Sequence, residues 1–196
     1  PNGEFTNNPE PLKEHLGDLM KEVVSQGADF GIVVDPDVDR LAFVDENGDM
    51  FGEEYTLVAV ADYVLANTPG NTVSNMSSSR ALRDVTNTHN GTYTASAVGE
   101  VNVVQMMKDT KAVIGGEGNG GIIYPELHYG RDSLVGVALF LSHLVEKRMT
   151  VSALRASYPS YFMSKKKIAL TPQIDVDAIL AGMVDKYAAE EINTID

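Results

Sequence analysis

Three aspartates lie in one short stretch of the chain, between two strongly apolar segments. The stretch reads Asp35-Pro36-Asp37-Val38-Asp39-Arg40. The apolar, β-branched residues at 30–34 and 41–44 predict two buried strands, so the acids lie in the turn that connects them. Three carboxylates this close repel one another unless a cation or strong donors neutralise them, and all-oxygen ligands suit Mg²⁺ or Ca²⁺. The sequence therefore predicts a metal site at Asp35, Asp37 and Asp39, next to Arg40, which can bind a phosphate oxygen.

Two other interpretations of this stretch remain. An EF-hand loop has the same spacing of acids, and Glu46 falls at its twelfth position, but the sixth position is Arg40 where the sharp turn needs Gly. The strand-like flanks also disfavour an EF-hand. The second alternative is a solvated acidic turn without a special role. The alternation of the acids between two apolar strands favours the metal site.

Composition limits the possible partners. A chain of 196 residues with 43% hydrophobic content can form one large or two small globular domains. A net charge of −13 argues against nucleic acid or an anionic membrane surface as a partner. The sequence has no cysteine, no apolar run near the ~20 residues of a membrane span and no signal-peptide pattern, which is compatible with a cytoplasmic enzyme. The chain begins without methionine, and we expect it to be a piece of a longer protein.

Helical and strand patterns alternate along the chain. Strands are predicted at 30–34, 41–44, 72–76, 92–97 and 112–115, and an Asn-Gly turn at 47–48 predicts a hairpin. Helices are predicted at 12–26, 57–65, 77–88 with serines as its cap, 101–107, 133–145, 150–156 and 176–189. This order indicates a layered α/β architecture.

A second unusual stretch follows the strand predicted at 112–115. It reads Gly115-Gly116-Glu117-Gly118-Asn119-Gly120-Gly121. The glycines let the backbone approach a ligand closely, and Glu117 and Asn119 offer groups suited to sugar hydroxyls. A flexible connector is the alternative, whereas a dinucleotide site is disfavoured by the spacing of the glycines. We therefore expect a ligand-binding loop.

Charged residues further along the chain are less informative. Asp132 is expected to favour the dipole at the start of the helix at 133–145, which leaves Arg131 free to face a cleft. Arg131 alone is equally compatible with a surface charge and a ligand contact. Three consecutive lysines at 165–167 are expected to form a solvated strand edge rather than a basic patch.

Taken together, these motifs resemble the α-D-phosphohexomutase superfamily, which includes phosphoglucomutase, phosphomannomutase and phosphoglucosamine mutase. The resemblance rests on the acidic stretch, Gly99-Glu100, the glycine-rich stretch and Gly130-Arg131-Asp132, in this order and spacing. The amino-acid sequence of residues 115–132 is most similar to the phosphoglucosamine-mutase-type branch. The resemblance implies Mg²⁺ as the ion at the acidic stretch and hexose phosphate as the substrate.

The resemblance also implies a domain plan. Residues 1–52 would be the C-terminal half of domain 2 with the metal loop, 53–158 domain 3 with the sugar loop, and 159–196 a linker and the start of domain 4. The expected fold is a three-layer α/β/α domain with a mixed sheet, preceded by a partial domain of the same type. Domains 1 and 4 of the same polypeptide would then be its missing partners. Neither a Ser-His-Asn-Pro-like phosphoserine loop nor an Arg-x-Ser-x-Thr-Glu-Pro-like phosphate clamp occurs in the sequence.

The chemistry implied is transfer of a phosphoryl group from a phosphoserine to a hexose monophosphate, through a 1,6-bisphosphate. The residues implied to bind the sugar are Gly99, Gly116, Glu117, Asn119 and Gly120. The residues implied in catalysis are Arg40, Glu100 and Arg131. Arg131 falls where some members carry a lysine, and an arginine stabilises charge but is a poor proton shuttle. Glu100 could act as an acid–base group or orient the sugar. The alternatives are phosphoglucomutase/phosphomannomutase specificity and, in another class, a non-catalytic metal- or sugar-binding domain.

Overall fold

The structure is a computed structural model that describes residues 2–5, 8–164, 169–171, 173–190, 192 and 194–195. The chain divides into two compact units, Pro1–Tyr161 and Phe162–Asp196, and each is considered by itself. Within the described residues, no helix is long and apolar enough to span a lipid bilayer.

The first unit begins with a helix and a two-stranded antiparallel ribbon. Strand β1 (Gly31–Val34) pairs with β2 (Leu41–Val44), and the acidic stretch connects them as expected. Helix α1 (Gly17–Gln26) begins later than its apolar spacing predicts, because Lys13–His15 form a separate 3₁₀ turn, η1. The Asn-Gly turn is present, with Gly48 at φ 81°. The second arm of that hairpin is a single bridge between Val44 and Met50.

A four-stranded mixed sheet, in the order β4-β3-β5-β6, forms the centre of the unit. Strands β3 (Asn71–Asn75), β4 (Tyr93–Ser96) and β5 (Ala112–Glu117) are parallel. Strand β6 (Gly121–Ile123) runs antiparallel to β5. The sequence did not indicate β6, because the glycines before it match a loop pattern. The glycine-rich stretch is therefore the turn of a β5–β6 hairpin.

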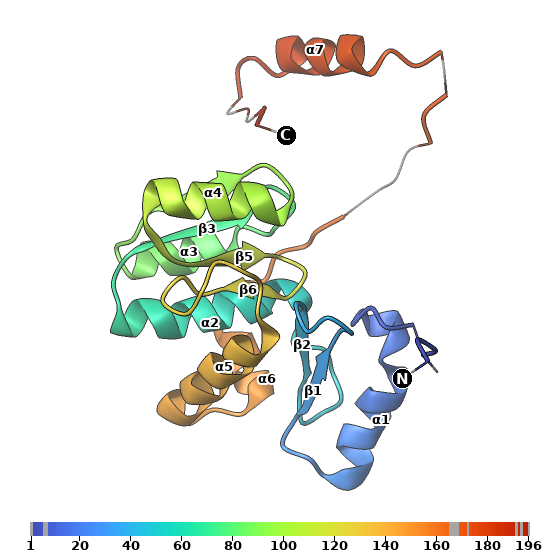
Figure 1. Cartoon of the computed structure of the whole chain (residues 1–196), viewed down its shortest axis with the longest axis vertical. Helices are drawn as coiled ribbons and strands as arrows, with labels where there is room; N and C mark the ends of the chain where they lie inside the picture. Colours follow the sequence, from blue (N-terminus) through green and yellow to red (C-terminus); the bar gives the residue numbers. More distant parts are fainter. Residues whose placement is uncertain are drawn as a thin grey trace. The chain divides into compact units, whose positions relative to one another are not determined.

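Helices cover both faces of this sheet, which confirms the expected α/β layers (Figure 1). Helix α4 (Glu100–Thr110) lies on one face, where it packs Val103 and Met107 against Val73 and Ile123. Helices α2 (Glu53–Asn67) and α3 (Ala81–Thr88) contact the other face. Beyond α2 lie α5 (Ser133–Lys147) and α6 (Val151–Ser157).

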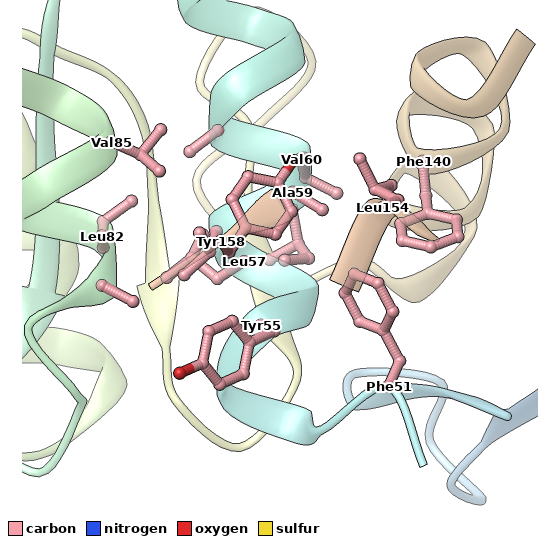
Figure 2. Packing of buried hydrophobic residues seen from close by; sticks show 14 of the residues in the cluster. Phe51, Tyr55, Leu57, Ala59, Val60, Leu82, Val85, Phe140, Leu154 and Tyr158 are labelled. Carbon is pink, nitrogen blue, oxygen red and sulfur yellow. The ribbon is translucent and has the colours of Figure 1, made fainter. Parts of the chain in front are cut away.

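The main hydrophobic core joins the ribbon to this layered domain. Helix α2 is apolar around most of its circumference and is buried between the sheet and α5, as Figure 2 shows for Leu57 and Val60. The ring of Phe43 on β2 stacks on Phe140 of α5 with centroids 3.8 Å apart, and Phe51 meets Phe140 edge-on at 5.1 Å. Burying one such ring stabilises the fold by about 1.5–3 kcal/mol. The position of the ribbon, and so of the acidic stretch, is thus fixed by aromatic packing.

A polar cluster links α2 to α3, α5 and α6. The carboxylate of Asp62 on α2 accepts hydrogen bonds from His89 (2.7 Å) and from the hydroxyl of Tyr158 (3.1 Å), and Nε2 of His143 lies 3.1 Å from it. Burial opposes the charge of Asp62, but the bonds from His143 and His89 outweigh it and lower the pKa of Asp62. The cluster links α2 and α5 to the ends of α3 and α6.

The second unit contains helix α7 (Val176–Lys186), which is capped by Asp175 through a bond from the Ala178 amide (3.0 Å). Helix α7 ends at Lys186, three residues earlier than the predicted helix at 176–189. The three lysines at 165–167, for which a solvated strand edge was expected, lie outside the described residues.

Candidate functional site

The acidic stretch folds into a turn organised around Asp35. Its Oδ1 accepts hydrogen bonds from the backbone amides of Asp39 and Arg40, both at 3.0 Å, and its Oδ2 accepts from Nε of Arg40 at 2.6 Å. Asp35 is only 2% exposed, whereas Asp37 in the same turn is exposed to solvent. Val38 adopts a positive φ of 59°, an unfavourable conformation for a β-branched residue. The packing around this turn therefore stabilises a strained backbone.

The three aspartates converge. Asp35, Asp37 and Asp39 each offer one carboxylate oxygen, and these oxygens lie within 4.8 Å of one another. Burial, together with Asp35 and Asp37, raises the pKa of Asp39 to about 6, although Arg131 opposes this rise. A divalent cation would relieve this repulsion, and oxygen ligands are those that Mg²⁺ prefers. The donor set therefore fits Mg²⁺.

The EF-hand interpretation is wrong. Strands flank the turn where an EF-hand has helices. Glu46 points elsewhere, because its carboxylate accepts hydrogen bonds from the amide (3.2 Å) and hydroxyl (2.5 Å) of Ser152 at the start of α6.

Arg40 lies beside the acidic turn. Besides its bond to Asp35, its Nη1 lies 3.4 Å from Oε1 of Glu10, and its side chain is 29% exposed. Its partners thus belong to the N-terminal segment and to its own turn.

The glycine-rich hairpin packs directly against the acidic turn. The amide of Leu41 donates to the carbonyl of Gly120 at 3.1 Å. Gly120 has φ 89°, and a Cβ atom there would lie 2.2 Å from the carbonyl oxygen of Leu41, so only glycine fits. The stretch is a hydrogen-bonded hairpin rather than an irregular connector.

Glu117, at the end of β5, points into the site and is only 6% exposed. Its Oε1 accepts from the side-chain amide of Asn75 at 2.7 Å, and its Oε2 from Nη1 of Arg131 at 2.9 Å. Asn119 lies at the limit of a hydrogen bond, 3.5 Å from Oε2 of Glu117, and uses its Oδ1 to accept from the Gly121 amide.

Asn75 and Ser78 are site residues that the sequence reasoning missed. The hydroxyl of Ser78 donates to Oδ1 of Asn75 at 2.7 Å and accepts from the Gly118 amide at 2.9 Å. The cap residue of α3 is Arg80 rather than a serine, but the hydroxyl of Ser79 accepts from the amide of Ala81, the first residue of α3, at 3.4 Å. Ser78 contacts the glycine-rich hairpin instead. A signal was present, because Asn75 ends a strand whose carboxyl edge adjoins that of β5.

Gly99 and Glu100 form the start of α4. Gly99 is the cap residue with φ 109°, and Glu100 is the first helical residue. The carboxylate of Glu100 accepts from the backbone amide of Arg131 at 3.2 Å and from its Nε at 3.1 Å. Its side chain is 36% exposed, more than those of Glu117 and Arg131, so it can reach a ligand from solvent.

Arg131 is not free, contrary to expectation. Besides Glu100 and Glu117, its Nη2 contacts the carboxylate of Asp39. Asp132 caps α5 as expected, with bonds from the amides of Leu134 (2.8 Å) and Val135 (3.0 Å). One guanidinium therefore brings together the acidic turn, the glycine-rich hairpin and the start of α4.

Comparison with known proteins gives two family matches. The family model described as phosphoglucomutase/phosphomannomutase, alpha/beta/alpha domain III, matches residues 52–161, and the model for domain II of the same family matches residues 1–48.

Among curated relatives, a phosphoglucomutase/phosphomannomutase of Thermococcus kodakarensis is 35% identical over 85% of this chain and 37% of its own length. A probable phosphoglucosamine mutase of Methanopyrus kandleri is 32% identical over 100% of this chain and 44% of its own length. The chain thus spans less than half the length of these relatives.

Among solved structures, a phosphoglucomutase/phosphomannomutase family protein from Burkholderia thailandensis has a TM-score of 0.74 and 25% identity, covering 96% of this chain and 41% of that one. An Aspergillus fumigatus N-acetylphosphoglucosamine mutase in complex with GlcNAc-6P and magnesium has a TM-score of 0.53 and 13% identity, covering 81% of this chain and 41% of that one. The latter shows a likeness of fold alone.

Proposed function

Because this chain belongs to the phosphoglucomutase/phosphomannomutase family, we propose that its protein interconverts hexose 6-phosphates and hexose 1-phosphates. The observation that carries the proposal is the contact of one residue, Arg131, with both Asp39 of the acidic turn and Glu117 of the sugar loop. A phosphoryl group bound at the acidic turn and the hydroxyls of its hexose would then occupy one site.

The acidic turn is proposed to hold Mg²⁺ through Asp35, Asp37 and Asp39. Bound there, the ion would offset negative charge on the transferring phosphoryl group. Arg40 is proposed to add a fixed positive charge beside it, because its guanidinium is already oriented by Asp35 and Glu10. The magnesium complex of the Aspergillus fumigatus protein supports the choice of ion by analogy of fold.

The hairpin is proposed to bind the sugar. Glu117, with its orientation fixed by Asn75, can accept hydrogen bonds from two neighbouring hydroxyls, and Asn119 can donate or accept. Gly116 and Gly120 keep the backbone close to the ligand, and Gly99 does so at the start of α4. The same hydroxyl contacts would persist while the bisphosphate intermediate reverses its direction.

Glu100 is the proposed acid–base group. Its carboxylate is the most exposed of the three around Arg131, and a proton must leave the attacking hydroxyl during transfer. Arg131 is proposed to stabilise charge rather than to carry a proton, since a guanidinium stays protonated.

The proposed substrate is glucosamine phosphate. The match to the Methanopyrus kandleri protein over the whole chain supports it. The second candidate is glucose or mannose phosphate, because the Thermococcus kodakarensis relative is 35% identical.

The proposed domain boundaries are 1–52, 53–158 and 159–196. The family matches at 1–48 and 52–161 support the first two. We propose that domains 1 and 4 of the same polypeptide supply the phosphoserine and the phosphate clamp, which is consistent with the limited share of the relatives that the chain covers.

The test is a ³¹P NMR assay of the complete protein with Mg²⁺, a hexose bisphosphate and either glucosamine, glucose or mannose 6-phosphate. We expect the 1-phosphate to form, fastest from glucosamine 6-phosphate. Asp37→Ala should remove most turnover without unfolding the protein, because it deletes an exposed ligand rather than a core group. Asp49→Ala, at another exposed aspartate, should leave turnover unchanged. Unchanged turnover in Asp37→Ala would refute the metal role, and turnover of no hexose phosphate would refute the proposed function.

A further inference from the structure

Each of the three guanidinium nitrogens of Arg131 contacts a carboxylate, and the three carboxylates come from three separate elements. Its Nη2 contacts Asp39 in the β1–β2 turn, its Nη1 lies 2.9 Å from Oε2 of Glu117 at the end of β5, and its Nε lies 3.1 Å from Oε2 of Glu100 on α4. The side chain is 18% exposed. A guanidinium is a rigid planar fork, so it cannot move toward one of these partners without moving relative to the other two.

The backbone that follows Arg131 is anchored to β6 and to the acidic turn. The amide of Asp132 donates to the carbonyl of Ile122 on β6 at 2.8 Å, and the amide of Ser133 donates to the carbonyl of Val38 in the acidic turn at 3.0 Å. The aliphatic part of Arg131 lies against Gly121, where an added Cβ would approach its Cδ to 2.6 Å. The backbone and the aliphatic part of Arg131 are therefore held in place, and its guanidinium is the part that can shift between the three carboxylates.

The charges around this guanidinium do not balance. Three carboxylates contact the single positive charge of Arg131, and Asp39 also lies 3.7 Å from Nε of Arg40. A cation bound at Asp39 would neutralise that carboxylate and weaken its hold on Nη2, and the guanidinium would then bind Glu117 and Glu100 more closely. Each state of the acidic turn thus favours a different arrangement around Glu117.

We propose that Arg131 is a positioning residue that couples occupancy of the acidic turn by a divalent cation to the arrangement of the sugar loop. The inference rests on the proposed function for the identity of the two ligands. Since coupling between two sites is reciprocal, a sugar bound at Glu117 would also change the affinity of the turn for the cation.

The experiment is an NMR titration of the ¹⁵N-labelled chain with Mg²⁺, without sugar, so that its readout does not depend on turnover. In the wild-type chain we expect the backbone amide of Gly118 and the side-chain amide of Asn75 to shift with the same midpoint as the amide of Asp39. In Arg131→Met, the shift at Asp39 should remain and the shifts at Gly118 and Asn75 should be lost. Arg131→Lys keeps the positive charge but lacks the planar guanidinium. The shifts at Gly118 and Asn75 should be lost in this variant too.

Arg40→Met is the matched control. It also removes a guanidinium beside the acidic turn, but one whose partners are Asp35, Asp39 and Glu10 rather than Glu117. We expect it to keep the response of Gly118.

Three results would overturn the coupling. In the first, the shifts at Gly118 and Asn75 persist in both Arg131 variants. In the second, Arg40→Met abolishes these shifts as fully as the Arg131 variants do. In the third, only the amide of Asp39 shifts in the wild-type chain. If Mg²⁺ shifts no amide of the acidic turn, the proposed metal site fails as well. That outcome separates failure of the coupling from failure of the proposed function.

Discussion

At the scale of single residues, the site depends on carboxylates whose orientation other side chains determine. Glu117 is buried and bonded to Asn75 and Arg131 through different oxygens. Donors from two separate elements hold this buried carboxylate in one geometry. Glu117 could be singled out from the sequence because glycines surround it. Its partner Asn75 could not, because the bond between them spans 42 residues of sequence.

Glu117→Gln should lower kcat/KM of the complete protein for the hexose phosphate about tenfold to a hundredfold, since a hydrogen bond to a charged group contributes roughly 1.5–3 kcal/mol. The variant should still fold and bind Mg²⁺, because the aspartates are unchanged. Steady-state kinetics with each hexose phosphate measure the effect. Glu146→Gln, the same change at an exposed position of α5, is the control. Equal kinetics in Glu117→Gln and wild type would mean that the hairpin does not bind the sugar.

At the scale of elements, the sequence predicted those strands, turns and helix ends that depend on residues close together in the chain. The strands beside the acidic turn, the Asn-Gly turn and the capped start of α5 all follow from neighbouring residues, and the structure confirms them. Strand β6 could not be recognised, because its pairing with β5 depends on a turn of glycines that any loop could share. The contacts of Arg131 depend on three segments meeting in space, and no spacing in the sequence indicates them.

The contact between Glu46 and α6 gives a pH-dependent prediction at this scale. Burial opposes ionisation of Glu46, but hydrogen bonds from the side chains of Ser152 and Thr150 prevail and lower its pKa to about 2. Because the folded-state pKa lies below that of the unfolded chain, about 4.3, Glu46 stabilises the fold above that pH. This contribution, on the order of 1 kcal/mol for a partly exposed group, is lost as pH falls through about 2.

The measurement is urea unfolding of wild type and Glu46→Gln between pH 7 and pH 2. The difference in their free energies of unfolding should be constant near neutral pH and shrink from roughly pH 5 downward. Taking the difference cancels the many other carboxylates of the chain. A difference that does not depend on pH would show that Glu46 is not preferentially ionised in the fold.

At the scale of the whole molecule, the described residues up to Tyr161 contain a core of their own and both halves of the candidate site. They include neither a phosphoserine-loop motif nor a phosphate-clamp motif. We therefore predict that the chain folds but does not turn over. A cooperative thermal unfolding transition would establish folding, and ³¹P NMR with glucosamine 6-phosphate, a bisphosphate and Mg²⁺ should show no 1-phosphate. Product at a rate near that of the complete protein would contradict the proposed role of the other domains.

The central claim is that the acidic turn is the metal site of a phosphohexomutase. The most direct measurement is a crystal structure of the chain grown in saturating Mg²⁺. The account predicts one ion bound by an oxygen from each of Asp35, Asp37 and Asp39, at roughly 2.0–2.1 Å, with water completing its coordination. Asp35, Asp37 and Asp39 pointing in different directions, with no ion between them, would contradict it.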